Sequence, residues 1–351
     1  MSPRRIAVAL SGGVDSSVAA ALLVEQKEDV FGVMLRLDET AEGRNRCCSP
    51  ADVALARQVA SLLGIPFYVL PAAEAFREHV VGAFLSGYAQ GVTPNPCLAC
   101  NRAIRWGLLL NQAVALGATH LATGHYARTD TSTLPVRLLR GRDPAKDQSY
   151  VLAFLDQSQL SHALFPLGQR TKEETRVIAR RLRLPVADRA ESQDLCFLPP
   201  QGYRAFLRQQ LGPLSAGPIL DQHGTQLGQH SGLADYTIGQ RKGIGIPGPQ
   251  PLYVLRKDPA RNALVVGPRA ALARDRFRIA QASWITGTAP APGTRMTVRV
   301  RYHDHEVSAD FVGEPAQGEV QLTEPLMQIA PGQAAVFYAG EECLGGGIIQ
   351  P

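Results

Sequence analysis

The sequence lacks a long apolar segment. Hydrophobic residues make up 45% of the 351 positions and charged residues 19%, yet no uninterrupted apolar run approaches the roughly 20 residues that a membrane-spanning helix requires. The first residues, MSPRRIAVALSGG, lead directly into a strand-like segment and a glycine loop, so the apolar part is too short for a signal peptide. We therefore expect a cytoplasmic protein without a membrane span.

A structural disulfide framework is not expected either. The chain has six cysteines, and because a cytoplasmic compartment keeps thiols reduced, catalysis, metal binding or burial must explain them. Three of them, Cys47, Cys48 and Cys343, lie outside any motif that suits chemistry, and we interpret them as incidental. The remaining three cysteines are candidates for a functional site.

The chain is too long for one ordinary hydrophobic core, and its residue pattern changes along its length. In the first half, apolar strand-like runs alternate with amphipathic segments such as 51–63, which Gly64 stops, and this alternation predicts a parallel α/β sheet. A helical pattern extends from about 157 to 211, and short alternating runs separated by turn residues then predict two β-rich units. We expect an N-terminal α/β domain with a helical extension (1–211), a small central domain (212–270) and a C-terminal β-barrel domain (275–351).

A glycine-rich string lies between the first strand-like run and a helix-like segment, with the sequence Ser11-Gly12-Gly13-Val14-Asp15-Ser16-Ser17. Glycine lets a backbone approach phosphate closely, a helix N-terminus favours anions, and serine hydroxyls add hydrogen-bond donors. Asp15 is suited to hold Mg²⁺ against such phosphates. An ordinary strand-to-helix turn capped by Ser16 is the alternative interpretation.

The string lacks the lysine of the Walker loop GxxxxGK[ST], which serves γ-phosphate transfer. It resembles instead the PP-loop of the ATP pyrophosphatase superfamily. Members of that superfamily cleave ATP between the α and β phosphates, adenylate a carbonyl oxygen and let a nucleophile expel AMP. Because these enzymes act on several substrates, the motif identifies only the first half-reaction.

Two cysteines that are far apart in the sequence suit sulfur chemistry. Cys100 lies close to the start of a predicted helix and near Arg102, both of which lower a thiol pKa and favour the nucleophilic thiolate. Cys196 supplies a second thiol, and two thiols suit a relay in which one carries sulfur and the other releases it by forming a disulfide. A buried structural role for Cys196, or an iron–sulfur cluster or part of a zinc site on Cys97, Cys100 and Cys196, are the alternatives.

Other polar motifs suit contacts with adenosine or with RNA, and the net charge of +5 agrees with a polyanionic partner. Gly124 follows a strand-like run and lets an adenosine approach the backbone, while the adjacent His125 is a candidate RNA contact. The loop 146–148 and the basic strand around Arg301 and Tyr302 suit phosphate and RNA shape recognition. Ordinary solvated surface is the alternative for each of these segments.

Ordered motifs make the chain resemble the bacterial tRNA-specific 2-thiouridylase family over nearly its full length. In chain order they are ALSGGVDSS, TPNPCLACN, ATGHYAR, KDQSYVL, SQDLCF, YTIGQRKGIG, VRVRY, PGQAAVFY and CLGGGII. The resemblance implies ATP and Mg²⁺ as cofactors, adenylation of a wobble uridine of tRNA at O2, and sulfur transfer to C2 from a cysteine persulfide. The products are 2-thiouridine, AMP and pyrophosphate. The resemblance implies that 1–211 is the PP-loop ATP-binding catalytic domain and that the small central domain, 212–270, binds tRNA. The implied partners are tRNAs for lysine, glutamate and glutamine, and a sulfur-relay protein or cysteine desulfurase.

The resemblance also assigns residues to these roles. Cys100 is then the nucleophile, Cys196 carries the persulfide, and the two form a transient disulfide. The residues expected to contact ATP are Ala9, Leu10, Ser11, Gly12, Gly13, Val14, Asp15, Ser16, Met34 and Gly124. The residues expected at the target base are Asn95, Pro96 and Cys97. The residues expected to contact tRNA elsewhere are His125, Lys146, Asp147, Gln148, Arg301, Tyr302 and Gln333.

Cys97 departs from the family pattern, because many relatives carry aspartate there, with acid/base work assigned to it. A thiol is uncharged unless its pKa is lowered, so this role does not transfer directly to Cys97. Three roles stay open for Cys97: a thiolate acid/base, a cluster ligand, or a tolerated replacement beside substrate groups that handle the protons.

Two other functions compete with tRNA thiolation. A PP-loop synthetase that forms amides normally needs an ammonia-producing module, and no such module is visible in the sequence. A tRNA-binding or iron–sulfur sensing protein would have lost catalysis, whereas the string SGGVDS is intact.

Overall fold

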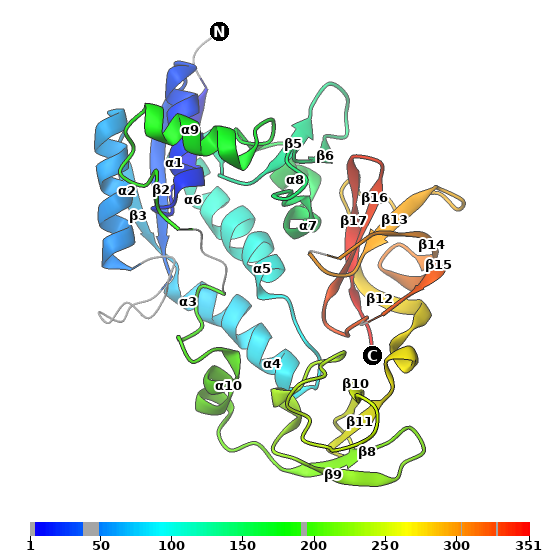
Figure 1. Cartoon of the computed structure of the whole chain (residues 1–351). Coiled ribbons are helices and arrows are strands. Elements are labelled where there is room, and N and C mark those ends of the chain that lie inside the picture. Colours follow the sequence, from blue (N-terminus) through cyan, green and yellow to red (C-terminus); the bar gives the residue numbers. More distant parts are fainter. Residues whose placement is uncertain (1–3, 38–48, 191–194, 303, 328) are drawn as a thin grey trace.

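The computed structural model describes residues 4–37, 49–190, 195–302, 304–327 and 329–351, which form three parts built on three sheets (Figure 1). The N-terminal part carries a five-stranded sheet, the central part a four-stranded sheet, and the C-terminal part most of an eight-stranded sheet. No helix within the described ranges has both the length and the apolar composition needed to cross a membrane. The expected fold class, an α/β domain followed by a small central domain and a β-barrel, is confirmed.

The N-terminal sheet has the strand order β3-β2-β1-β4-β7, and its neighbouring strands all run parallel. Its strands are β1 (Arg5–Ala9), β2 (Asp29–Arg36), β3 (Phe67–Pro71), β4 (His120–Ala122) and β7 (Ala163–Leu164). In the central strand, Ile6 and Val8 pack into one core cluster and Ala7 into another, so both faces of the sheet are covered. A run of apolar residues without polar alternation is what such a strand requires.

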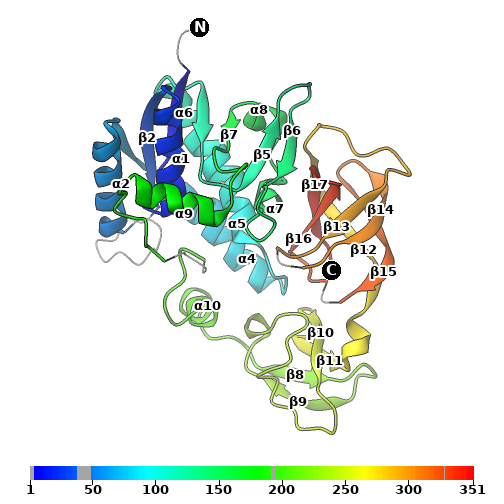
Figure 2. The same ribbon diagram turned by 45° about the horizontal axis from the view of Figure 1, so that its top comes forward.

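Helices cover this sheet, and α9 lies over α1 in both views (Figure 1, Figure 2). The helix α2 begins with a capping box between Ser49 and Asp52 and ends at Gly64, whose φ of 69° confirms the expected stop. The helices are α1 (Val14–Glu25), α2 (Pro50–Leu63), α3 (Ala73–Phe76), α4 (Ala83–Ala89), α5 (Pro96–Ala99), α6 (Leu110–Ala115), α7 (Ser149–Leu152), α8 (Gln157–Leu160), α9 (Lys172–Arg181) and α10 (Tyr203–Leu211). Two π-helical stretches, Arg77–Gly82 and Cys100–Leu109, connect α3 to α4 and α5 to α6.

The central part is a four-stranded sheet with the order β10-β11-β8-β9. Its strands are β8 (Gly217–Leu220), β9 (Gln226–His230), β10 (Tyr253–Asp258) and β11 (Ala263–Gly267). Ile219, Val254 and Leu264 are fully buried in a small core of its own. The sheet packs beside α4 through Lys257, whose ammonium lies 5.5 Å from the centre of the Tyr88 ring.

The C-terminal sheet curls into a barrel, because its first strand, β12, also pairs with β17. The barrel strands are β12 (Arg274–Trp284), β13 (Met296–Arg299), β14 (Val307–Glu314), β15 (Gln317–Leu326), β16 (Ala334–Ala339) and β17 (Glu342–Ile349). Two strands from the N-terminal part, β5 (Ala127–Asp130) and β6 (Arg137–Arg140), extend the same sheet, since β6 pairs antiparallel with β17. The N-terminal part and the barrel therefore share one hydrogen-bonded sheet.

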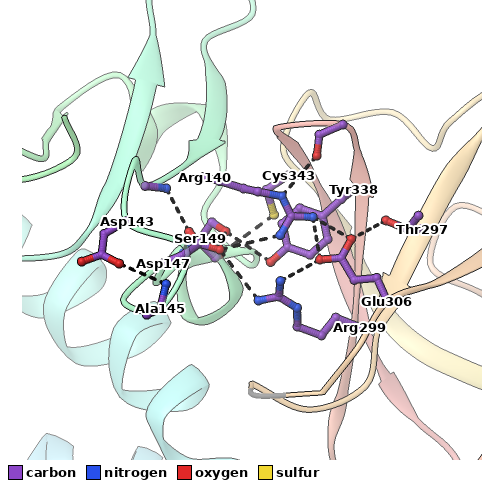
Figure 3. A network of polar contacts seen from close by, with 12 residues as sticks. Arg140, Asp143, Ala145, Asp147, Ser149, Thr297, Arg299, Glu306, Tyr338 and Cys343 are labelled. Atoms are coloured by element: carbon purple, nitrogen blue, oxygen red, sulfur yellow. Dashed lines mark hydrogen bonds and ion pairs between the residues drawn. The ribbon is translucent and has the colours of Figure 1, made fainter. Parts of the chain in front are cut away.

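A polar network reinforces this junction (Figure 3). Asp147 is 4% exposed and accepts hydrogen bonds from the amides of Gly141 and Ser149, at 3.0 and 3.1 Å, and from the Ser149 hydroxyl at 2.9 Å. Arg140 and Arg299 each lie 3.8 Å from the same carboxylate, and both also pair with Glu306. The network joins β6, the loop before α7, and the barrel.

The buried Lys257 gives a testable consequence of the packing between the central part and α4. Its ammonium has no hydrogen-bond partner among the residues that the structure describes, and burial lowers the pKa of Lys257 from 10.5 to about 8. Between pH 8 and 10.5 the unfolded chain therefore binds more protons at this site than the folded chain, so stability rises with pH across that window. Lys257→Met should raise stability at pH 7 by roughly 1–3 kcal/mol and reduce this rise.

Thermal unfolding of the full chain at pH 7 and pH 10 measures this effect. Lys242→Met is the matched control, because Lys242 is an exposed lysine of the same central part. A lower Tm for Lys257→Met at pH 7, with an unchanged dependence on pH, would show that the ammonium is stabilised by its surroundings.

Candidate nucleotide-binding and cysteine site

The glycine loop connects β1 to α1 with its backbone turned tightly against α2. Gly12 has a φ of +70°, and a Cβ atom there would lie 2.8 Å from the carbonyl oxygen of Asp52. Gly13 is the N-cap of α1 and provides no side chain to cap the helix. The first backbone amides of α1 are therefore not capped by a side chain and can donate hydrogen bonds to an anion, as a phosphate-binding loop requires.

The serines of the loop brace its backbone. Ser16 lies inside α1, where its hydroxyl is 3.1 Å from the amide of Ser11 and 3.2 Å from the carbonyl of Gly13. Ser17 donates to the same carbonyl at 2.8 Å. The alternative of an ordinary turn capped by Ser16 does not hold, because Ser16 is past the cap position.

Asp15 lies at the centre of a polar group that the sequence reasoning did not find. The ammonium of Lys172, at the start of α9, is 2.7 Å from both carboxylate oxygens of Asp15. The hydroxyl of Tyr126 donates to the same carboxylate at 2.9 Å, and burial together with the charge of Asp15 raises the pKa of Tyr126. In the sequence, the capping box that begins at Thr171 indicates where α9 starts. It does not indicate which residue Lys172 contacts.

A second long-range contact fixes the loop from the other side. The guanidinium of Arg189 donates to the carbonyl oxygen of Gly12 at 2.7 Å and pairs with the buried carboxylate of Asp52. Arg176 on α9 in turn donates to the carbonyl oxygens of Ala187 and Arg189. The segment around Arg189 is therefore attached to the glycine loop, and no local sequence pattern predicted this attachment.

Gly124 lies directly against the glycine loop, whereas Met34 belongs to the buried core of the sheet. A Cβ atom on Gly124 would lie 2.7 Å from the amide nitrogen of Ser16, so only glycine fits there without displacing the loop. Leu10 and Met34 are each 2% exposed and belong to the core on one face of the sheet. Because these two side chains are buried in the core, an ATP contact at these positions would come from the backbone.

Cys97 and Cys100 lie at the start of the helical segment that continues into α6. Asn95 caps this segment by accepting a hydrogen bond from the amide of Cys97 at 3.1 Å. Cys97 is exposed and Cys100 half-buried. Cys100 begins a π-helical stretch, a distortion that is frequent at functional sites.

The structure brings Cys100 and Cys196 to one hydrophobic cluster. Both cysteines pack against the buried side chains of Phe76, Val80 and Ile104. Phe197 fixes the Cys196 segment through edge contacts with the rings of Phe76 and Phe84, at centroid distances of 6.0 and 5.2 Å. Two half-buried thiols on one cluster suit a relay between them.

The metal alternative is not supported. Across the parts of the chain that are described, no three side chains of His, Cys, Asp or Glu come together as a metal site. Cys97, Cys100 and Cys196 all lie in those parts and form no such group. Cys47 and Cys48, which we interpret from the sequence as incidental, lie outside the described residues.

The side chains of two expected tRNA contacts are engaged inside the protein. His125 is 5% exposed, with Nδ1 2.7 Å from the hydroxyl of Thr123 and Nε2 3.2 Å from the guanidinium of Arg105. Burial and the charge of Arg105 lower the pKa of His125 to about 3, so the imidazole is neutral at physiological pH. Asp147 lies in the network of Figure 3 rather than at the surface.

The other expected tRNA contacts are more accessible. Lys146, Arg301 and Tyr302 are half-buried, and Tyr302 packs edge-on against the ring of Tyr150. Gln148 accepts a hydrogen bond from the amide of Tyr126 at 3.0 Å. Gln333 donates to the carbonyl oxygen of Thr93 at 2.7 Å. The structure thus places Gln333 of the barrel beside the segment that carries the cysteines.

Comparison with known proteins identifies the family. Three protein-family models match consecutive parts of the chain: the tRNA methyl transferase HUP domain at 4–200, the tRNA methyl transferase PRC-barrel domain at 204–268, and the aminomethyltransferase beta-barrel domain at 274–349. The tRNA-specific 2-thiouridylase MnmA of Chloroflexus aurantiacus is 47% identical over 350 residues, covering 98% of both chains. The chain belongs to the tRNA-specific 2-thiouridylase family. Proteins with the same name from Magnetococcus marinus (46%, 99% of both chains) and Acidithiobacillus ferrooxidans (44%, 100% of this chain and 99% of the other) agree.

The exposures of the cysteines predict a simple order of thiol reactivity. Cys97 is exposed, whereas Cys343 is fully buried and burial raises the pKa of Cys343 to about 12. In the folded protein, a short treatment with iodoacetamide at pH 8 should alkylate Cys97 at least about tenfold faster than Cys343, because only a thiolate reacts. Mass spectrometry of peptides measures both rates, and protein unfolded in guanidinium is the control. Similar rates at the two sites in the folded state would contradict the burial of Cys343.

Proposed function

We propose that this protein catalyses ATP-dependent 2-thiolation of the wobble uridine of tRNA, as its curated relatives are named to do. The observation that carries the proposal is the packing of Cys100 and Cys196 on one cluster, in a domain whose glycine loop leaves a helix N-terminus uncapped by any side chain. One site suits activation by ATP, and the other suits delivery of sulfur. An amide-forming synthetase has no use for the second site.

In the first half-reaction, the glycine loop binds the phosphates of ATP through the backbone of residues 9–16, and Gly124 makes room for the nucleoside. The uracil O2 attacks the α-phosphorus and pyrophosphate leaves, which turns O2 into part of an AMP leaving group. Asp15 is the residue that would hold Mg²⁺, a hard cation that prefers carboxylate oxygens and would neutralise phosphate charge. Lys172, which contacts both oxygens of Asp15, supplies a further positive charge at the same place.

In the second half-reaction, Cys196 carries a persulfide whose terminal sulfur attacks C2 of the adenylated uridine, and AMP leaves with the former O2. The Cys100 thiolate then attacks the Cys196 sulfur, which releases 2-thiouridine and leaves a Cys100–Cys196 disulfide. A thiol reductant restores both thiols before the next turnover. A sulfur-relay protein or a cysteine desulfurase supplies the persulfide sulfur. Cys97, exposed and beside Asn95 and Pro96, stands at the target base in place of the aspartate of many relatives.

We propose that the substrates are tRNAs for lysine, glutamate or glutamine and that the protein acts on them in the cytoplasm. The bound tRNA spans the three domains, whose boundaries lie near residues 211 and 270. The half-buried Lys146, Arg301 and Tyr302 supply side-chain contacts to RNA. His125 and Asp147 act mainly by holding the surrounding loops, because their polar atoms already have partners inside the protein.

The decisive experiment is mass spectrometry of nucleosides from tRNA incubated with the protein, ATP, Mg²⁺ and a sulfur donor. 2-Thiouridine at the wobble position, formed only when ATP is present, is the expected product. Release of pyrophosphate and AMP without any thiolated nucleoside would contradict the proposal and favour another acceptor.

Replacement of Asp15 separates nucleotide chemistry from RNA binding. Asp15→Asn should reduce AMP formation by at least about a hundredfold, because a neutral amide holds Mg²⁺ far more weakly than a carboxylate and forms no ion pair with Lys172, while tRNA affinity stays nearly unchanged. Asp188→Asn is the matched control, since Asp188 is an exposed aspartate that pairs with Arg180. AMP formation by Asp15→Asn at the rate of this control would remove Asp15 from the mechanism.

Replacement of the two cysteines should trap different species. Cys100→Ser and Cys196→Ser should each abolish thiolation, but only the Cys100 variant should still carry a persulfide on Cys196 after incubation with the sulfur donor. Alkylation followed by mass spectrometry identifies the added sulfur on either cysteine. Thiolation at the wild-type rate by one of these variants would exclude that cysteine from the relay.

A further inference from the structure

Cys97 and Cys100 belong to one tight helical turn. The amide of Cys100 donates to the carbonyl oxygens of both Pro96 and Cys97. The second of these bonds is that of a 3₁₀ helix, a geometry that aligns side chains three residues apart. Helix geometry places the Cα atoms of such residues about 5 Å from each other, within the range of roughly 4.4–6.8 Å over which a disulfide closes. Cys97 and Cys100 are therefore spaced to form a disulfide with each other.

Two asparagine side chains fix the backbone at Cys97. The carboxamide oxygen of Asn95 accepts a hydrogen bond from the amide of Cys97 at 3.1 Å. The carboxamide nitrogen of Asn101 donates to the carbonyl oxygen of Cys97, also at 3.1 Å, and Asn101 is buried. Because the backbone is held at both of its polar groups, rotation about χ1 moves the Cys97 thiol toward Cys100 without disturbing the turn.

The cysteines of the site differ in their access to solvent. Cys97 is exposed, whereas Cys100 and Cys196 are half-buried and pack on the cluster that contains Phe76 and Ile104. A disulfide is reduced when a thiolate attacks one of its sulfurs, and the rate depends on access to that sulfur. A Cys100–Cys196 disulfide on this cluster is therefore a poor target for a reductant as large as a protein.

We propose that Cys97 is the resolving thiol of the sulfur relay, which moves the disulfide from the half-buried pair to an exposed pair. Once the thiolated base has left, the Cys97 thiolate attacks the Sγ atom of Cys100, the bond from Cys100 to Cys196 breaks, and Cys196 leaves as a thiolate. One disulfide and one thiolate are consumed and one of each is formed, so the exchange itself needs no oxidant or reductant. A dithiol reductant then supplies the two electrons that return Cys97 and Cys100 to thiols.

This inference rests on the proposed function, because the Cys100–Cys196 disulfide is the product of the second half-reaction. It gives Cys97 a role other than acid/base work, ligation of a cluster or simple replacement of aspartate. Aspartate cannot take part in thiol–disulfide exchange, so the step belongs to a chain with cysteine at this position. Cys196 is regenerated first and can accept the next persulfide sulfur while the Cys97–Cys100 disulfide is reduced.

Disulfide mapping of the full-length protein, without tRNA or ATP, tests the exchange. The protein is oxidised with diamide, quenched with acid at successive times, alkylated in denaturant and digested for mass spectrometry. In the wild type, the Cys97–Cys100 disulfide should accumulate with Cys196 alkylated, whereas Cys97→Asp should keep the Cys100–Cys196 disulfide. A wild type that holds only the Cys100–Cys196 disulfide at all times, with Cys97 alkylated, would overturn the proposal.

Reduction kinetics show whether the exposure of Cys97 matters. A thioredoxin-type dithiol protein should reduce the oxidised wild type at least about tenfold faster than oxidised Cys97→Asp, because only the wild type presents an exposed sulfur. Dithiothreitol is small enough to approach the cluster, so it should show a much smaller difference between the two proteins. Equal rates with the dithiol protein would mean that it reaches the Cys100–Cys196 disulfide directly, and Cys97 would have no resolving role.

Two further variants control for the loss of a thiol and for the added charge. Cys343→Ala is the matched control, because it removes a thiol from a different core cluster, and it should behave as the wild type does. Cys97→Ser should behave as Cys97→Asp does, since both lack the thiol. Thermal unfolding checks the fold of each variant. Iron that is bound to anaerobically prepared wild type and lost from both Cys97 variants would assign Cys97 to a cluster and overturn the proposal.

The outcomes also separate this inference from the proposed function. If the wild type forms 2-thiouridine but never the Cys97–Cys100 disulfide, the resolving step fails and the function stands. If the disulfide moves to Cys97 and Cys100 while the wild type never forms 2-thiouridine, the exchange stands and the function fails.

Discussion

The buried carboxylate of Asp147 is the interaction on which the assembly of this protein depends. Placing a charge in the interior costs several kcal/mol unless hydrogen bonds and opposite charges compensate for it. Here two backbone amides, one hydroxyl and two guanidinium groups surround the carboxylate, and they come from both the catalytic half and the barrel. The network sets the barrel at one fixed position, and that position brings Gln333 to Thr93. The position of the cysteine segment relative to the barrel follows from it.

The glycine loop has a comparable dependence on distant residues. Its backbone conformation follows from Gly12 and Gly13, but its surroundings come from Lys172 and Arg189, which lie far along the chain. Both residues belong to α9 or the segment after it, and this segment continues toward Cys196. The glycine loop is therefore held directly by α9 and by the segment around Arg189.

Much of this organisation could be predicted from local pattern. Alternating apolar and amphipathic runs predicted the parallel sheet, and the string from Ser11 to Ser17 predicted the glycine loop between β1 and α1, because the backbone conformation of such elements is determined by consecutive residues. The pairing of Cys100 with Cys196 on one cluster was foreseeable only from the chemistry of two thiols and the family resemblance. Lys172 and Arg189 were missed, since their partners are more than a hundred residues away and single-sequence periodicity carries no such information.

The polar loops show a second limit of sequence reasoning. A loop containing Asp147 or His125 has the same composition whether its side chains face RNA or the interior, and only the folded chain distinguishes the two. The joining of β5 and β6 to the barrel sheet was likewise not predicted, because the sequence of two four-residue strands does not reveal which sheet edge they will pair with.

That shared sheet has a consequence for any attempt to study the domains apart. A fragment ending near residue 211 would retain β6 but lose β17, leaving a row of unpaired amides and carbonyls on an exposed strand edge. Such an edge is a template for pairing with another chain, so the isolated catalytic half would tend to self-associate and precipitate. If the protein were divided at its domain boundaries, the exposed edge of β6 would promote aggregation. In the intact chain, β6 and β17 pair with each other, so neither edge is exposed.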